Sequence, residues 1–307
     1  MAIQWRDERI EGSAVAIGIF DGVHQGHQKL IERARAHSES VTALTFFPHP
    51  TALLAPEKEP TYLLTLADRV LQLRLSGADS VAIAPFTEEF ARMSAEEFIE
   101  EILIRELKAS HIIVGENFRF GAKAQGDVAL LRSRPEFVTE EVPLVTGVPI
   151  DSGNVETISS TRIRALIKEG HVVQASEYLT RPHQLVGEVI HGEKRGREIG
   201  YPTANLGYDA KATIPKDGIY AGWLTVDTYR WQAAISVGRN PHFPKEGGER
   251  GVQVEAYAID KEGLDLYGQM ARIEFGYRLR ETMAFASLED LLAQMRIDVD
   301  EARRLTA

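Results

Sequence analysis

The sequence predicts two differently built domains, an α/β domain followed by a small antiparallel β-barrel domain that ends in a helix. The chain has 307 residues, and domains commonly hold about 100 to 200 residues each. Up to about residue 180, short β-branched runs alternate with helix-like segments, which is typical of a parallel sheet with crossover helices. Beyond residue 184, alternating or aromatic-rich runs follow one another with glycine-rich turns between them, which indicates antiparallel structure. We place the domain boundary at this change of pattern, giving domains 1–182 and 183–307.

In the first domain, strands and helices are expected to alternate along the chain. The expected strands are residues 14–20, 41–47, 80–86 and 110–115. The expected helices are residues 27–37, 66–77 and 94–107, where apolar residues recur at three- and four-residue spacing. Gly77 is a plausible end of the second helix.

In the second domain, five runs have the pattern of short strands. They are residues 185–190, 218–226, 231–237, 252–260 and 269–275. A helix-like tail begins at Ser287. Consecutive strands with few helices between them favour an antiparallel sheet or barrel.

Composition and charge exclude several classes of protein. Hydrophobic residues make up 44% and charged residues 26% of the chain, as in folded soluble proteins. With 35 basic and 45 acidic residues the net charge is −10, which argues against nucleic acid as a partner. The absence of cysteine excludes disulfides, thiol catalysis and cysteine-ligated metals. Because the sequence has neither a signal peptide nor a bilayer-spanning stretch, we expect a cytoplasmic protein without a membrane partner. A homo-oligomer is possible.

The turn after the first strand is the strongest candidate site in the first domain. The strand 14–20 runs into D-G-V-H-Q-G-H, at the end of the sheet where α/β proteins bind ligands. A helix beginning near His27 would direct its free amides, together with His24 and His27, at a bound anion. Two alternatives stay open from the residues alone: histidines that merely cap a helix, and a His-x-x-His metal site, which lacks an adjacent third ligand.

The string G-I-F-D-G-V-H-Q-G-H-Q-K-L at 18–30 closely resembles the H-x-G-H signature of nucleotidylyltransferases. It has the form seen in prokaryotic bifunctional riboflavin kinase/FAD synthetases, and further segments follow in that family's order. They are F-F-P-H-P at 46–50, L-T-L-A-D-R at 64–69, V-G-E-N-F-R-F-G at 114–121, and I-S-S-T-R-I-R at 158–164. The resemblance implies a Rossmann-like FMN adenylyltransferase domain.

This resemblance also implies roles for individual residues. His24, His27 and Arg164 are expected to stabilise charge on the transferring adenylyl group and on the departing pyrophosphate. The expected ATP-binding residues are Gly18, Phe20, Asp21, Gly26, Ser159, Ser160 and Thr161. The expected flavin- or nucleotide-binding residues are His49, Asn117 and Asp127. The hydroxyls of 159–161 precede a helical stretch, where simple helix capping is the alternative.

In the second domain, a glycine-rich basic segment is a candidate phosphate-binding loop. Its predicted ATP-binding residues are Gly192, Lys194, Gly196, Arg197 and Gly200. Thr203 and Asn205 then offer a hydroxyl and an amide oxygen, which can supplement phosphate oxygens on Mg²⁺. Hairpin turns are the alternative for the glycines. Glu255 lies in an alternating strand, on the face of Gln253 and Tyr257, where a solvated strand surface is the alternative.

A second resemblance, to the riboflavin kinase domain, covers G-x-V-x-x-G-x-x-x-G-R-x-x-G-Y-P-T-A-N-L, G-I-Y-A, S-V-G-x-N-P-x-F, V-E, D-L-Y-G and L-R. It implies Glu255 as catalytic base and Arg280 as a flavin-binding residue. The whole chain is then expected to phosphorylate riboflavin to FMN and to adenylylate FMN to FAD, with ATP and Mg²⁺.

The sequence departs from the family's usual residues at five positions. They are Phe47, Asn117, His242, Thr282 and Ala284. Two other functions stay open: a chain with only one active half, and a flavin-binding regulator or storage protein without turnover.

Overall fold

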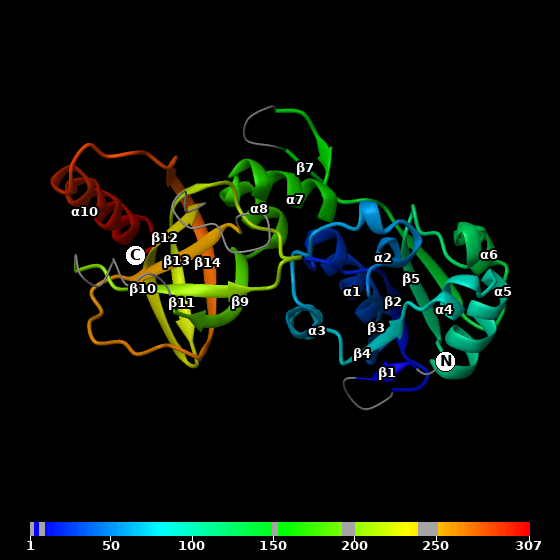
Figure 1. The fold of residues 1–307 in the computed structure, drawn as a ribbon. Coiled ribbons are helices and arrows are strands. Elements are labelled where there is room, and N and C mark those ends of the chain that lie inside the picture. Colours follow the sequence, from blue (N-terminus) through cyan, green and yellow to red (C-terminus); the bar gives the residue numbers. More distant parts are fainter. Residues whose placement is uncertain (1–2, 6–9, 149–152, 192–199, 239–250) are drawn as a thin grey trace. The chain divides into compact units, whose positions relative to one another are not determined.

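The computed structural model describes residues 3–5, 10–148, 153–191, 200–238 and 251–307 (Figure 1). The chain divides into two compact units, Met1–Ser160 and Thr161–Ala307. The segment from Thr161 to the start of the barrel groups with the second unit. The predicted domain boundary between residues 182 and 183 differs from this division and stays a prediction.

The first unit contains a six-stranded sheet in the order β1-β4-β3-β2-β5-β6. All neighbours are parallel except β1, which pairs antiparallel with β4. The strands are β1 (Gln4–Trp5), β2 (Ala14–Ile17), β3 (Val41–Phe47), β4 (Ser80–Pro85), β5 (His111–Gly115) and β6 (Val138–Val142). The predicted α/β fold is confirmed, and β1 and β6 are additions to the predicted strands. A two-stranded ladder, β7 (Thr146–Gly147) with β8 (Glu156–Thr157), follows the sheet.

The helices of this unit confirm two predictions and correct the third. They are α1 (Gln25–His37), α2 (Pro50–Leu54), α3 (Leu66–Leu75), α4 (Glu88–Arg92), α5 (Ala95–Glu97) and α6 (Val128–Arg132), with short 3₁₀ turns at Pro56–Lys58 and Ala122–Ala124. Gly77, at φ +107°, follows the end of α3 as expected. The predicted α-helix at 94–107 is instead the short α5 followed by the π-helix η2 (Phe98–Glu106). Its i→i+5 pattern appears in the hydrogen bond from Leu107 N to Ile102 O.

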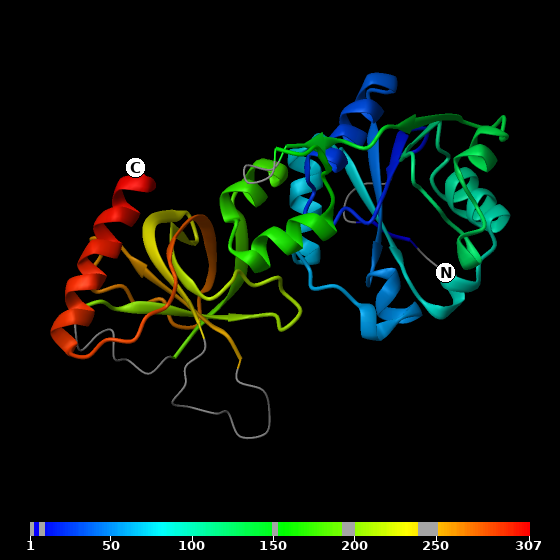
Figure 2. The same cartoon turned by 90° about the horizontal axis from the view of Figure 1, so that it is seen from above.

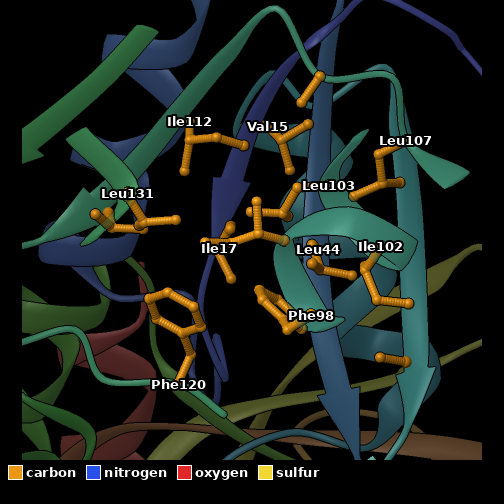
Figure 3. Close-up of a cluster of buried hydrophobic side chains, with 14 of the residues drawn as sticks. Val15, Ile17, Leu44, Phe98, Ile102, Leu103, Leu107, Ile112, Phe120 and Leu131 are labelled. Carbon is orange, nitrogen blue, oxygen red and sulfur yellow. The ribbon is translucent and has the colours of Figure 1, made fainter. Parts of the chain in front are cut away.

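The two faces of the sheet are buried by different helices, because side chains alternate along each strand. Val15 and Ile17 of β2 point into a cluster with Leu44, Ile112 and the apolar residues of η2 (Figure 3). Ala14 and Ala16 point to the other face, where they pack against residues of α1 and α3. This burial on both faces holds β2 at the centre of the unit.

His111, at the amino end of β5, makes the stability of this unit depend on pH. The rings of His37 and His111 stack at 4.9 Å, and His37 also bonds Glu140, which pairs with Arg33. Burial, and then the charge of His37, lower the pKa of His111 from 6.5. The unfolded chain therefore binds this proton more readily, so stability falls as pH drops below about 6.5.

His111→Asn is expected to flatten that dependence. The measurement is the midpoint of thermal unfolding between pH 7.5 and 5.5, for the wild type and the variant. An equal slope in both proteins would contradict the assignment to His111.

The second unit is a closed antiparallel barrel in the order β10-β13-β12-β11-β14-β9. Its strands are β9 (His183–Ile190), β10 (Thr203–Tyr208), β11 (Gly218–Val226), β12 (Tyr229–Gly238), β13 (Gln253–Ala258) and β14 (Met270–Arg280). Helices α7 (Ser160–Glu169) and α8 (Val172–Leu179) precede it, and α10 (Leu288–Leu305) runs along its outside (Figure 2). The predicted barrel with a C-terminal helix is confirmed, and β10 is an addition to the predicted strands.

Two glycines let the strands approach closely in this barrel. A Cβ at Gly222 would lie 1.9 Å from the carbonyl oxygen of Glu274, and a Cβ at Gly187 would lie 2.1 Å from that of Gly207. Any side chain at these positions would force the strands apart. The barrel interior is filled by alternate apolar residues of the six strands.

Candidate active sites

The sheet of the first unit has a topological switch point between β2 and β5. The chain proceeds from β2 to β3 and β4 on one side, then crosses to β5 and β6 on the other. The loops that leave the carboxyl ends of β2 and β5 therefore diverge, and ligands of open α/β sheets bind in the crevice that results. The predicted residues from Gly18 to His27, and Asn117, follow these two strands.

The turn after β2 is held in an unusual conformation. Phe20, Gly22 and Val23 have φ values of +56°, +87° and +43°. Such angles are costly for a β-branched residue and persist only where the surroundings fix them. Phe20 and Val23 are fully buried, which supplies that constraint.

His24 and His27 are brought together at the start of α1. Their rings stack at 3.7 Å with an interplanar angle of 22°. Helix α1 begins at Gln25, two residues earlier than predicted, and the His24 side chain makes no capping hydrogen bond. The capping alternative is therefore wrong for His24. Gly26 permits the arrangement, because a Cβ there would lie 3.2 Å from the His24 ring.

The amides of the first helical turn of α1 complete this site. The N–H groups at a helix N-terminus point along the helix axis, and the helix dipole makes this end attractive to anions. Among the described residues, no group of three or more acidic or histidine side chains could hold a metal ion. The two stacked histidines at the start of α1 are the side chains that could meet a bound anion here.

Asp21 lies beneath the site, with its carboxylate turned inward. It is 1% exposed, and it accepts hydrogen bonds from Leu63 N at 3.1 Å and Leu64 N at 3.3 Å. The hydroxyl of Ser160 donates to the backbone carbonyl of Asp21 at 2.8 Å. Asp21 and Ser160, both predicted to bind ATP, therefore connect the turn to neighbouring segments by hydrogen bonds. Gly18 continues the line of β2, with its N–H bonded to Leu44 O.

The predicted residues after β5 divide between the surface and a helix cap. Asn117 is exposed. Asp127 caps α6 by accepting from Leu130 N at 3.0 Å and pairs with Arg119 at 3.0 Å. The hydrogen bond from Leu130 N contributes most to lowering the pKa of Asp127. This carboxylate is therefore ionised near neutral pH.

His49, at the exit of β3, has a local role. The ring Nδ1 of His49 accepts from Thr51 N at 3.2 Å and caps α2. The backbone N–H of His49 donates to the Tyr62 hydroxyl at 3.3 Å. Phe47 is 37% exposed at the same carboxyl end of the sheet. A role of His49 toward nucleotide stays a prediction.

Helix α7 begins at Ser160, so Ser160 and Thr161 lie inside the helix instead of preceding it. Ser159 directly precedes the first helical residue. Arg164 is buried and belongs to the second compact unit, whereas His24 and His27 belong to the first. That Arg164 meets the two histidines stays a prediction.

The barrel brings three of the predicted kinase residues, Thr203, Asn205 and Glu255, onto one outer face. Asn205 of β10 pairs directly with Glu255 of β13, and the Thr203 hydroxyl donates to Glu255 Oε2 at 3.1 Å. The alternation predicted for β13 is confirmed, since Val254 and Ala256 are buried and Glu255 is not. A carboxylate, a hydroxyl and an amide oxygen therefore share one small surface.

A pocket of about 40 Å³, open to solvent, adjoins Thr203. Thr203 lines it, together with apolar side chains and Lys261. Its other lining residues are Val189, Pro202, Ala204, Leu224, Ala256, Ala258, Leu264, Leu266 and Tyr267. Its walls include buried residues of the barrel interior, among them Leu224 and Ala256.

Of the five predicted ATP-binding residues of the kinase site, the structure describes only Gly200. Gly200 has φ +87° and open space around it. Gly192, Lys194, Gly196 and Arg197 lie outside the described residues, as does the departure at His242.

Arg280 is engaged by the C-terminal helix. Its Nε and Nη2 donate to the Asp298 carboxylate at 2.9 and 2.6 Å, and Nη1 donates to Glu281 O. Gln294 also donates to Asp298 at 3.0 Å. The flavin-binding role stays a prediction, and Asp298 is a residue that sequence reasoning missed. The departures Thr282 and Ala284 follow Arg280 on an exposed segment.

Comparisons with known proteins match both units. The FAD synthetase family model matches residues 6–162, and the riboflavin kinase family model matches residues 179–306. The bifunctional riboflavin kinase/FMN adenylyltransferase of Listeria monocytogenes is 32% identical and covers 99% of this chain and 95% of its own length. That of Bacillus subtilis is 33% identical, with 95% and 92% covered.

A solved structure also covers nearly the whole chain. It is that of a macrolide-efflux protein from Streptococcus pneumoniae, with a TM-score of 0.84, 30% identity, and 95% and 94% of the two chains covered. Among the described residues of this chain, no helix is both long enough and apolar enough to cross a membrane.

The two family models match in the order predicted from the motifs, and the relatives share about a third of their residues over almost their full length. The resemblance is thereby confirmed: this chain belongs to the family of bifunctional riboflavin kinases/FMN adenylyltransferases.

Proposed function

We propose that the chain makes FAD from riboflavin in two ATP-dependent steps, with the barrel unit phosphorylating riboflavin and the first domain adenylylating FMN. The observation that carries this proposal is the presence of two separate constellations. The stacked pair His24 and His27 lies at a helix N-terminus, and Glu255 lies with Thr203 and Asn205 on the barrel.

In the kinase step, the terminal ribityl hydroxyl of riboflavin attacks the γ-phosphorus of ATP. The new O–P bond forms as the bond to the β–γ bridging oxygen breaks, so FMN and ADP result. Glu255 accepts the hydroxyl proton as general base. The Thr203 hydroxyl fixes the Glu255 carboxylate at 3.1 Å.

Thr203 and Asn205 are the residues that would hold Mg²⁺ with the phosphates of ATP. A hydroxyl and an amide oxygen are hard ligands of the kind this cation accepts. When bound, the cation neutralises phosphate charge during transfer. The glycine-rich segment from Gly192 to Gly200 is proposed to cover the phosphates.

In the second step, an FMN phosphate oxygen attacks the α-phosphorus of ATP, and pyrophosphate leaves. The nucleophile is already an anion, so no base is needed. The difficulty is repulsion between two polyanions. His24, His27 and the amides of α1 offset that repulsion by donating hydrogen bonds to the phosphate oxygens, with Arg164 assigned to the same task. Asp21 and Ser160 hold the turn from beneath.

The test is incubation of the purified protein with riboflavin, ATP and Mg²⁺, and separately with FMN, followed by chromatographic separation of the three flavins over time. FMN appearing before FAD is the expected result. FAD from FMN but no product from riboflavin would leave only the adenylyltransferase active. Tight flavin binding without ADP or pyrophosphate would overturn the proposal in favour of a binding protein.

A further inference from the structure

Arg69, on α3, is the largest fully buried side chain of the described residues, with 0% exposure. Burying a guanidinium removes its hydration, which is costly even when the charge is paired. Its helical neighbour Leu73 fills the same kind of buried position with an apolar side chain. Packing alone therefore gives no reason for an arginine here.

The contacts of Arg69 supply that reason. Its Nη1 donates to the carbonyl oxygen of Ile19 at 3.1 Å and to that of Phe46 at 3.3 Å. These carbonyls lie where the chain leaves β2 and near the end of β3. Its Nη2 lies 3.9 Å from Oδ1 of Asp21, which is itself buried. One guanidinium thus joins two strand ends and the acid of the turn between β2 and α1.

That turn is the strained segment that leads into His24. Three of its four residues have positive φ, and a strained backbone keeps its shape only while neighbouring contacts fix it. The contacts on Asp21 and on the Ile19 carbonyl therefore determine where the two histidine rings stand.

We infer that Arg69 is a positioning residue for adenylyl transfer, and this inference rests on the proposed function. It acts through Ile19 and Asp21 on the turn that aims His24 and His27 at the phosphates. Being fully buried, it touches no substrate. Its loss should lower the rate of the chemical step, because a misplacement of about 1 Å can cost about 100-fold.

The experiment compares Arg69→Met and Arg69→Lys with the wild type in FAD formation from FMN, well below the unfolding midpoint. Arg69→Met is expected to lower kcat about 10- to 100-fold, with the KM for ATP changed much less. Arg69→Lys keeps the charge but loses the branched set of N–H donors of the guanidinium. Its kcat should therefore lie between those of the wild type and Arg69→Met. Arg92→Met, which removes an exposed arginine of the same unit, is the matched control and should keep the wild-type kcat. FMN formation from riboflavin should be unchanged in all variants.

A merely structural role would lower the unfolding midpoint and leave the kcat of the folded enzyme unchanged. Wild-type kcat in folded Arg69→Met would therefore overturn the inference. If that variant does not fold, wild-type kcat in folded Arg69→Lys and Asp21→Asn would overturn it instead. Absence of FAD formation in the wild type would show that the proposed function itself has failed.

Discussion

Glu255→Gln is expected to abolish FMN formation from riboflavin while FAD formation from FMN continues at the wild-type rate. The amide keeps the size of the side chain but cannot accept the ribityl proton. General base catalysis typically contributes about 10²- to 10⁴-fold, so kcat for the kinase should fall by that factor. The measurement is ADP release with riboflavin, beside pyrophosphate release with FMN.

A matched control for this variant lies on the same barrel. Glu274 also faces outward, on β14, where it pairs with Arg230 at 2.8 Å, away from Thr203. Glu274→Gln should leave both activities intact. Wild-type kinase turnover in Glu255→Gln would refute Glu255 as the base, and loss of both activities would indicate a folding defect.

His27→Ala is expected to produce the opposite separation of activities. Removing one preorganised donor to a developing charge typically costs about 10²- to 10³-fold in kcat. The stacking partner His24 also loses its neighbour at 3.7 Å, which adds to the loss. FAD formation from FMN should therefore nearly vanish, whereas riboflavin phosphorylation should proceed and FMN should accumulate.

The control for His27→Ala comes from the other end of the same helix. His37 is the last residue of α1 and bonds Glu140, at the amino ends of the strands. His37→Ala should keep FAD formation at the wild-type kcat. If His27→Ala instead stopped both steps in a folded protein, the assignment of the two reactions to separate units would be wrong.

The fold class can be predicted from the sequence because burial leaves a strong local pattern. Strand β3 lies at the predicted residues, since V-T-A-L-T-F-F is buried on both faces for almost its whole length. Strand β10 leaves a weak pattern: T-A-N-L-G-Y contains asparagine and glycine, and its pairing with β9 and β13 determines its conformation. The π-helix has the same apolar spacing as an α-helix, so only its hydrogen bonds distinguish it.

The site residues also divide into those that the sequence can predict and those that it cannot. Thr203, Asn205 and Glu255 lie on strands whose alternation already indicates a shared outward face. Arg280 and Arg69 are different, because their carboxylate partners Asp298 and Asp21 lie on α10 and on the turn after β2, which share no strand register with the arginines. Nothing in the local sequence shows that such a pairing will form, so neither ion pair can be predicted.

The closed barrel also constrains the synthesis of the protein. Strand β9, the first of the barrel to leave the ribosome, pairs with β14, the last. Pairing between such distant segments is slow, since a long loop must close before any contact forms. Until residue 280 has emerged, β9 exposes an edge and an apolar face that a chaperone or a second chain can bind. The parallel sheet of the first unit is complete by then, so the two halves of this enzyme should fold in sequence during translation.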